Sequence, residues 1–155
     1  MRNIHFGSGD ITTLILIKED AIIESDINKH YVTPLENRGL DRENIAVYGL
    51  LYEDSKIKAE LGKNYLRMLL SKINKMNTIQ NLIVADTSYF KWLIKKSKIT
   101  DCYGETFKPK FEGYEDFKAV IVPNYKSLFY NPHNEDLIKE GLTAVLSIKM
   151  PDPKF

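Results

Sequence analysis

Cysteine is nearly absent from this sequence, in which Cys102 is the one thiol among 155 residues. An intramolecular disulfide is therefore excluded, and one cysteine with three histidines offers no spacing typical of a zinc site. Long apolar runs are also missing: the longest have the length of a strand, and residues 1–10 contain none that would suit a signal peptide. These absences predict a cytoplasmic protein that does not enter a membrane.

An excess of either charge is missing as well. Lysine and arginine number 22 and aspartate and glutamate 21, so the net charge is +1. A protein that binds nucleic acid through bulk charge would be far more basic, so any such binding requires a local patch. With 43% hydrophobic and 28% charged residues, a largely disordered chain is excluded. We expect one domain over residues 1–150 and a tail, or the start of a linker, over 151–155.

Four short apolar runs predict the strands of a sheet. They cover residues 12–17, 45–52, 81–85 and 119–122. Because the apolar residues are almost uninterrupted, both faces of each strand are expected to be covered, as in a parallel sheet. Residues 1–10 are polar, and we expect them to form a loose arm or a short edge element.

Helical patterns lie between these runs. The strongest spans residues 56–75, where apolar side chains recur at helical spacing. Residues 86–87 (Asp-Thr) are typical of a helix start, and residues 133–134 lead into a last helix. A Thr-Pro pair at 33–34 predicts the start of a short helix that ends at Gly39. The alternation indicates an α/β fold: a three-layer α/β/α sandwich around a central, mostly parallel four-stranded sheet.

Several sequence motifs that bind or transform small molecules are missing. The chain has no dinucleotide-binding glycine motif, no P-loop and no nucleophile elbow, and we expect no cofactor. In a sheet of this kind ligands bind beyond the carboxyl ends of the strands, which places candidate sites in the loops 18–21, 53–55, 86–88 and 123–127.

These loops contain five carboxylates, namely Glu19, Asp20, Glu53, Asp54 and Asp86. One interpretation is a Mg²⁺ site or a general base that acts on a nucleotide or phosphoester. The other is helix capping and ordinary turn chemistry, which favours the same residue types.

A basic segment with interleaved aromatic residues runs from residue 91 to residue 110. It holds six lysines and two acidic residues, together with Trp92, Tyr103 and Phe107. Lysines beside stacking aromatics suit a single strand or a phosphate backbone. A solvated helix face with core aromatics would produce the same pattern.

The second half of the chain follows a recognisable order of segments. A buried strand, NLIVADT, leads into a helix ending LIKKSKIT, and an extended segment, DCYGETFKPKFEGYEDF, follows. Then come a strand, AVIVP, a loop, NYKSLFYNP, and a last helix, NEDLIKEGLTAVLSI. This layout resembles the C-terminal half of the uracil-DNA glycosylase superfamily. It is most similar to the glycosylase-like domain at the N-terminus of some bacteriophage family A DNA polymerases.

The resemblance implies roles for two residues. Aligned on the Asn-Pro pair at 131–132, Asn124 stands where the family has the histidine that stabilises the departing uracil anion. Asp20 stands where the family has its water-positioning carboxylate, without the glycines or proline that shape that loop. Ligands for the iron–sulfur cluster of some members are also lacking. Since both motifs with strict geometry are altered, the resemblance implies a glycosylase fold kept for binding rather than cleavage.

We therefore expect a catalytically degenerate module of a phage DNA replication protein, which binds single-stranded or duplex DNA or a polymerase partner. The candidate DNA contacts are Lys95, Lys96, Lys98, Lys108, Lys110, Tyr125, Lys126 and Phe129. Lys126 would contact phosphate, and Tyr125 or Phe129 would stack on or wedge between bases, unless these rings pack in the core.

Besides a generic protein–protein adaptor, two alternatives stay open. One is an active but divergent uracil-DNA glycosylase, in which Asp20 holds water and Asn124 contacts the base. The other is the Mg²⁺-dependent site on the acidic rim.

Overall fold

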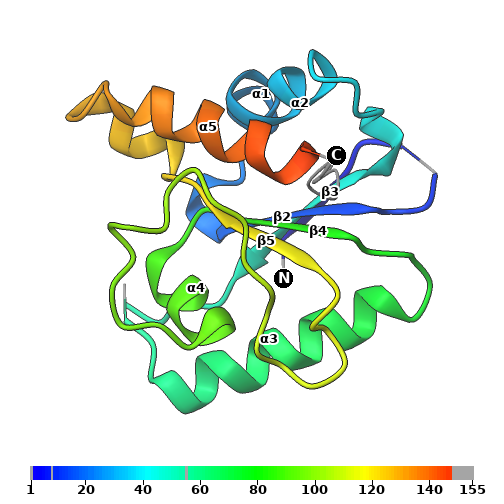
Figure 1. Cartoon of the computed structure of the whole chain (residues 1–155), viewed down its shortest axis with the longest axis vertical. Coiled ribbons are helices and arrows are strands. Elements are labelled where there is room, and N and C mark those ends of the chain that lie inside the picture. Colours follow the sequence, from blue (N-terminus) through cyan, green and yellow to red (C-terminus); the bar gives the residue numbers. More distant parts are fainter. Residues whose placement is uncertain (1, 8, 55, 148–155) are drawn as a thin grey trace, which may run out of the picture.

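The computed structural model describes residues 2–7, 9–54 and 56–147. A five-stranded sheet with the order β1-β3-β2-β4-β5 runs through it (Figure 1). The strands are β1 (Asn3–His5), β2 (Thr13–Lys18), β3 (Ile45–Leu50), β4 (Asn81–Val84) and β5 (Lys118–Ile121). Strands β2 to β5 are parallel, as predicted, and β1 pairs antiparallel with β3 at the edge. The expected number of four strands is wrong, because residues 3–5 form an additional strand, the short edge element that was one of the two forms expected for residues 1–10.

Helices lie against both faces of the sheet (Figure 1). On one face are α3 (Ala59–Asn74) and α4 (Thr87–Ile94). On the other are α5 (Asn134–Leu146) and a composite helix made of α1 (Glu24–Ile27), the π-helical η2 (Asn28–Val32) and α2 (Thr33–Glu36). Three short 3₁₀ turns complete the elements: η1 (Glu19–Ala21), η3 (Arg42–Asn44) and η4 (Tyr125–Phe129).

The apolar strands are explained by burial on both faces. In β2, Leu14 and Leu16 pack toward α3 and α4, whereas Ile15 and Ile17 pack toward the composite helix and α5. All four side chains are fully buried. Each contributes about 1.5–3 kcal/mol of hydrophobic stabilisation, so the strand tolerates a polar residue only at its ends.

The short helix expected to begin at Thr33 begins earlier. Helical geometry starts at Glu24, and the backbone of Thr33 is itself helical, so Thr33 is not an N-cap. The chain reaches Pro34 through the π-helical turn η2, and Pro34 lies in the first turn of α2. Gly39 ends this segment as predicted, with a positive φ of 98° that suits glycine.

The boundaries of the other predicted elements differ by a few residues. The helix predicted over 56–75 is observed over Ala59–Asn74, and the strand predicted over 45–52 ends at Leu50. The last helix begins at Asn134. The predicted domain end at residue 150 and the tail over 151–155 lie outside the described residues. Within the described ranges, no helix is long and apolar enough to cross a membrane.

Candidate functional site

A pocket of about 390 Å³ lies at the carboxyl ends of β2, β4 and β5. Lys18 ends β2, Asp86 follows β4 and Asn124 follows β5, and all three line it. The connections that leave β2 and β4 run on opposite faces of the sheet, which opens a crevice between the ends of these two neighbouring strands. Ligands of open α/β sheets bind at this type of position. We call it the strand-end pocket.

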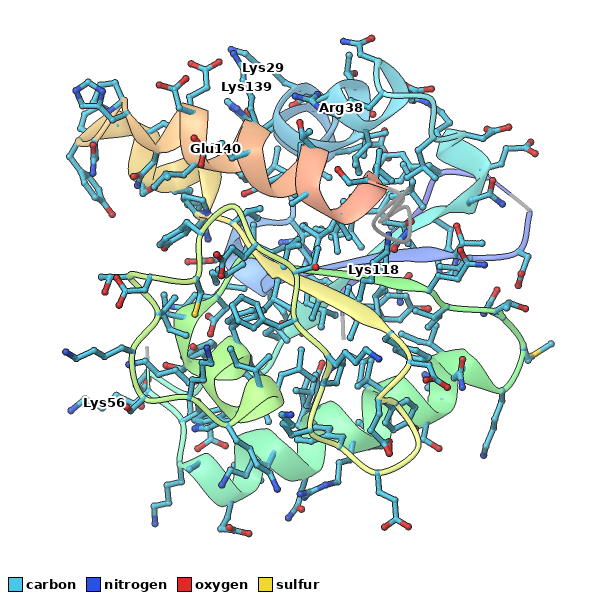
Figure 2. The ribbon with its side chains drawn as sticks, in the orientation of Figure 1. Lys29, Arg38, Lys56, Lys118, Lys139 and Glu140 are labelled. Carbon is cyan, nitrogen blue, oxygen red and sulfur yellow. The ribbon has the colours of Figure 1, made fainter. Side chains whose placement is uncertain are left out.

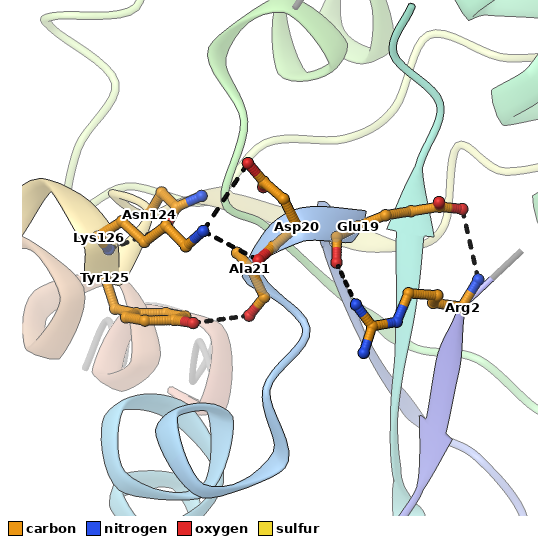
Figure 3. A network of polar contacts seen from close by, with 7 residues as sticks. All are labelled: Arg2, Glu19, Asp20, Ala21, Asn124, Tyr125 and Lys126. Atoms are coloured by element: carbon orange, nitrogen blue, oxygen red, sulfur yellow. Dashed lines mark hydrogen bonds and ion pairs between the residues drawn. The ribbon is translucent and has the colours of Figure 1, made fainter.

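Asp20 and Lys126 meet at the edge of the strand-end pocket (Figure 3). Lys126 Nζ donates a hydrogen bond of 2.9 Å to the Asp20 carbonyl oxygen and lies 3.8 Å from Asp20 Oδ2. The two side chains are 44% and 71% exposed, so this ion pair adds at most about 1 kcal/mol to stability. Its effect is to join η1 to η4 and to hold one lysine beside the pocket.

Asn124 lines the same pocket and begins η4. Its Oδ1 accepts a hydrogen bond of 2.9 Å from the Lys126 backbone N–H, and its carbonyl oxygen accepts one of 2.7 Å from Ser127 Oγ. The amide oxygen is thus committed to capping its own turn. Asn124 is neutral and offers no cationic ring to a departing anion.

Asp86 is the buried carboxylate of the strand-end pocket, at 8% exposure. One oxygen accepts a hydrogen bond of 3.0 Å from the Tyr89 N–H and so caps α4, which confirms the predicted helix start. The Tyr52 hydroxyl donates to the same carboxylate, with 2.9 and 2.7 Å to its two oxygens. Burial raises the pKa of Asp86, although these hydrogen bonds and the nearby Lys18 act in the opposite direction.

The aromatic residues of the loop after β5 have opposite environments. Tyr125 is buried: its hydroxyl donates to the Ala21 carbonyl oxygen at 2.8 Å (Figure 3), and its ring stacks on His30 with centroids 5.1 Å apart. Phe129 is 95% exposed, and Tyr130, which lines the strand-end pocket, is 79% exposed. The rings available for stacking on a base are therefore those of Phe129 and Tyr130, and Tyr125 supports the loop from inside.

The lysine-rich segment lies mostly away from this pocket. Lys95, Lys96 and Lys98 are exposed and follow the carboxyl end of α4, whereas Asp86 caps the opposite end of that helix. Lys110 is also exposed, and its backbone N–H donates to the Leu93 carbonyl oxygen. Lys108 lines a separate cleft of about 1100 Å³ between residues 104–108 and α5, where Lys118, Lys139 and Glu140 also lie (Figure 2).

The aromatic residues of this segment are divided between the core and the pocket. Trp92 packs against Tyr89, with ring centroids 5.0 Å apart, and against Gly62, where a Cβ atom would overlap its ring. Phe107 lies beneath Lys96, whose Nζ is 4.7 Å from the ring centroid. Tyr103 is the residue of this segment that reaches the strand-end pocket in the described part of the chain.

The five carboxylates of the loops do not form a cluster. Glu19 is held by Arg2, Asp20 by Lys126, and Asp86 is buried under Tyr52. In residues 2–7, 9–54 and 56–147, no group of three or more histidine, cysteine, aspartate or glutamate side chains is arranged to hold a metal ion. The geometry therefore gives the Mg²⁺ interpretation no support.

Lys18, Tyr52 and Tyr130 were assigned no role from the sequence, although Lys18 lies in the candidate loop 18–21. Lys18 and Tyr130 line the strand-end pocket, and Tyr52 bonds its buried carboxylate. Lys18 stands at the end of an apolar run, where a charged side chain is a usable signal. The other two offer no such signal, because exposed and buried tyrosines look alike in a sequence.

Comparison with models of protein families finds no match to this chain. Comparison with curated protein sequences finds none either. What the chain does therefore has to be inferred from its pocket, its charges and its exposed rings.

Proposed function

We propose that this chain is a DNA-binding module with a catalytically degenerate uracil-DNA glycosylase fold and that it serves a phage replication protein. A single strand would be held at the strand-end pocket, and a DNA polymerase is the partner that the sequence resemblance suggests. The observation that carries the proposal is the pair of exposed rings, Phe129 and Tyr130, beside a pocket lined by Lys18 and Lys126.

Single strands need stacking surfaces as well as positive charge. Every base has a π-face, and stacking on an aromatic side chain contributes about 1–3 kcal/mol per base. Phe129 has almost no contact with the rest of the protein, so its ring is free to stack. Because Tyr125 anchors the same loop in the core, the exposed rings are presented from a fixed support, which limits the entropy lost on binding.

The chemistry of the pocket favours binding over cleavage. Departure of a uracil anion is aided by a strong or charged hydrogen-bond donor, whereas Asn124 is neutral and uses its amide oxygen as a turn cap. The Asp20 carboxylate is largely exposed and neighbours Lys126, an arrangement with little control over an attacking water.

Replacing Phe129 with alanine is expected to weaken binding of single-stranded DNA by about 5- to 150-fold. Since the ring is 95% exposed, the free energy of unfolding should change by no more than about 0.5 kcal/mol. Fluorescence anisotropy of a labelled twelve-residue oligothymidylate, measured at two salt concentrations, checks the effect. Met76→Ala removes a similarly exposed apolar side chain and should leave the affinity unchanged. Equal affinities for Phe129→Ala and the unmodified protein would remove the η4 loop from the interface.

An active glycosylase is the second candidate, because the fold brings both Asp20 and Asn124 to the strand-end pocket. Under the binding proposal, uracil-containing single-stranded DNA incubated with the protein should gain no abasic sites. Alkaline cleavage of the labelled strand is the measurement. Cleavage that disappears in Asp20→Asn would show that the altered motifs still work and that the protein is an enzyme.

A further inference from the structure

A second hollow adjoins the strand-end pocket. Its volume is about 430 Å³, and its lining includes Arg2, Leu51 and Tyr52 together with Lys18 and Asp20. We call it the Tyr52 hollow. Lys18 and Asp20 line both spaces, so the two are neighbours along the carboxyl edge of the sheet. Each volume is near the lower end of the range for small-molecule sites, about 300–1,000 Å³.

The shared wall between the two spaces is held in place from both sides. Arg2 Nη1 donates to the Glu19 carbonyl oxygen at 3.4 Å on the side of the Tyr52 hollow. On the side of the strand-end pocket, Lys126 and Tyr125 donate to the carbonyl oxygens of Asp20 and Ala21 (Figure 3). The turn η1 therefore separates the two spaces and is hydrogen-bonded on both sides.

Lys18 is the cation positioned at this turn. It ends β2, and its Nζ lies 4.3 Å from the centroid of the Tyr52 ring. Within the described residues Lys18 has no carboxylate within 4.0 Å, whereas Lys126 lies beside Asp20. Lys18 lies near enough to the buried Asp86 carboxylate to lower its pKa, but it forms no ion pair with it within 4.0 Å. This half-buried ammonium between two nucleotide-sized spaces therefore remains available to a single anionic group.

We propose that the strand-end pocket and the Tyr52 hollow are adjacent nucleotide subsites, and that Lys18 binds the phosphodiester linking the two nucleotides. This inference rests on the proposed function, because it assigns the arrangement of a DNA strand on the same edge. In a single strand one phosphodiester joins each pair of neighbouring nucleosides. One cation between two nucleotide-sized spaces matches this arrangement. The ring of Tyr52 offers a stacking surface for the second base once Lys18 turns toward phosphate.

Competition against the labelled oligothymidylate tests this arrangement with three probes. Thymidine 5′-monophosphate fills one subsite, thymidine 3′,5′-bisphosphate adds the second phosphate, and the dinucleotide pTpT adds the second base. We expect the bisphosphate to bind about tenfold more tightly than the monophosphate, and pTpT to bind more tightly again. In Lys18→Gln the gain from the second phosphate should vanish, and Lys18→Arg should restore it. Lys72→Gln is the matched control, because Lys72 is exposed in the last turn of α3, from which the chain leads to the amino end of β4.

The outcomes separate the two proposals. If the protein binds the oligothymidylate but the three probes compete equally, the second subsite is excluded and the DNA-binding function stands. If Lys18→Gln weakens all three probes by one common factor, the assignment of Lys18 to the linking phosphodiester is excluded and the DNA-binding function stands. If no oligothymidylate binds at all, both proposals fail. Urea unfolding of each Lys18 variant shows whether it is folded. If Lys18→Gln does not fold, Lys18→Arg still tests the proposal, because it keeps the positive charge.

Discussion

Replacing Asp86 with alanine is expected to lower the free energy of unfolding by about 2–4 kcal/mol. The substitution removes the N-cap of α4 and leaves the Tyr52 hydroxyl without its acceptor at a half-buried position. A lost cap costs about 1 kcal/mol, and a lost hydrogen bond to a charged group costs about 1.5–3 kcal/mol. Urea unfolding followed by circular dichroism measures the change.

An exposed capping aspartate provides the matched control for this experiment. Asp41 accepts a hydrogen bond of 3.0 Å from the Glu43 N–H at the start of η3, at an exposed position. Asp41→Ala removes a cap without burying an unpaired group, so we expect a loss of about 1 kcal/mol or less. Equal losses in the two variants would mean that the hydrogen bond between Tyr52 and Asp86 adds nothing to stability.

The effect of Asp86 on stability should also depend on pH. Because burial raises its pKa, the native state binds a proton more readily than the unfolded chain, whose aspartate pKa is about 3.9. The stability that protonation adds is fully present below the unfolded pKa and is lost as pH rises through the raised value. Asparagine does not titrate, so the unmodified protein should gain stability relative to Asp86→Asn as pH falls from 7 toward 4. A constant difference over this range would contradict the raised pKa.

Replacing Tyr31 with phenylalanine is expected to destabilise the protein by about 2–4 kcal/mol. The Tyr31 hydroxyl is buried and donates to the Pro123 carbonyl oxygen at 2.8 Å, while it accepts a hydrogen bond of 2.9 Å from the Tyr125 N–H. Phenylalanine leaves both backbone groups unpaired in the core. Because these groups flank Asn124, the proposed DNA binding should weaken together with stability.

The loss of stability in Tyr31→Phe should not depend on pH between 5 and 8. Burial raises the pKa of Tyr31, so its hydroxyl keeps its proton throughout that range. Tyr130→Phe is the control, since that tyrosine is 79% exposed, and we expect a change within about 0.5 kcal/mol. Urea midpoints measured across the pH range compare the variants. A loss of less than 0.5 kcal/mol in Tyr31→Phe would show that water satisfies the two backbone groups.

Much of the sheet is predictable because its strands are buried on both faces. A strand such as β2 must then be apolar throughout, and this produces a continuous run that is visible in the sequence. The start of α4 is equally local, since Asp86 caps a helix that begins at the next residue. By contrast, the strand β1 is short and polar, and it exists because its backbone pairs with β3.

The location of the candidate site was also predictable, and its composition was not. The carboxyl ends of parallel strands converge at one edge, so loops as distant as those of Asp20 and Asn124 were expected to meet there, and both line the strand-end pocket. Lys95, Lys96 and Lys98 were predicted to contact DNA because lysines are dense in that part of the chain, yet they follow the carboxyl end of α4, away from the strand-end pocket. A high density of lysines along the sequence does not specify which face of the molecule the lysines occupy.

The sequence by itself determined the α/β class, the strands buried on both faces, the main helices and the end of the sheet at which the candidate pocket lies. Each follows from local periodicity, capping or strand direction. Tertiary structure decided which aromatic ring is available: Tyr125 is buried by Tyr31, Ala21 and His30, whereas Phe129 meets solvent. It also decided that Lys126 lies beside Asp20. Such contacts join segments about a hundred residues apart, and only the packing of the whole chain brings them together.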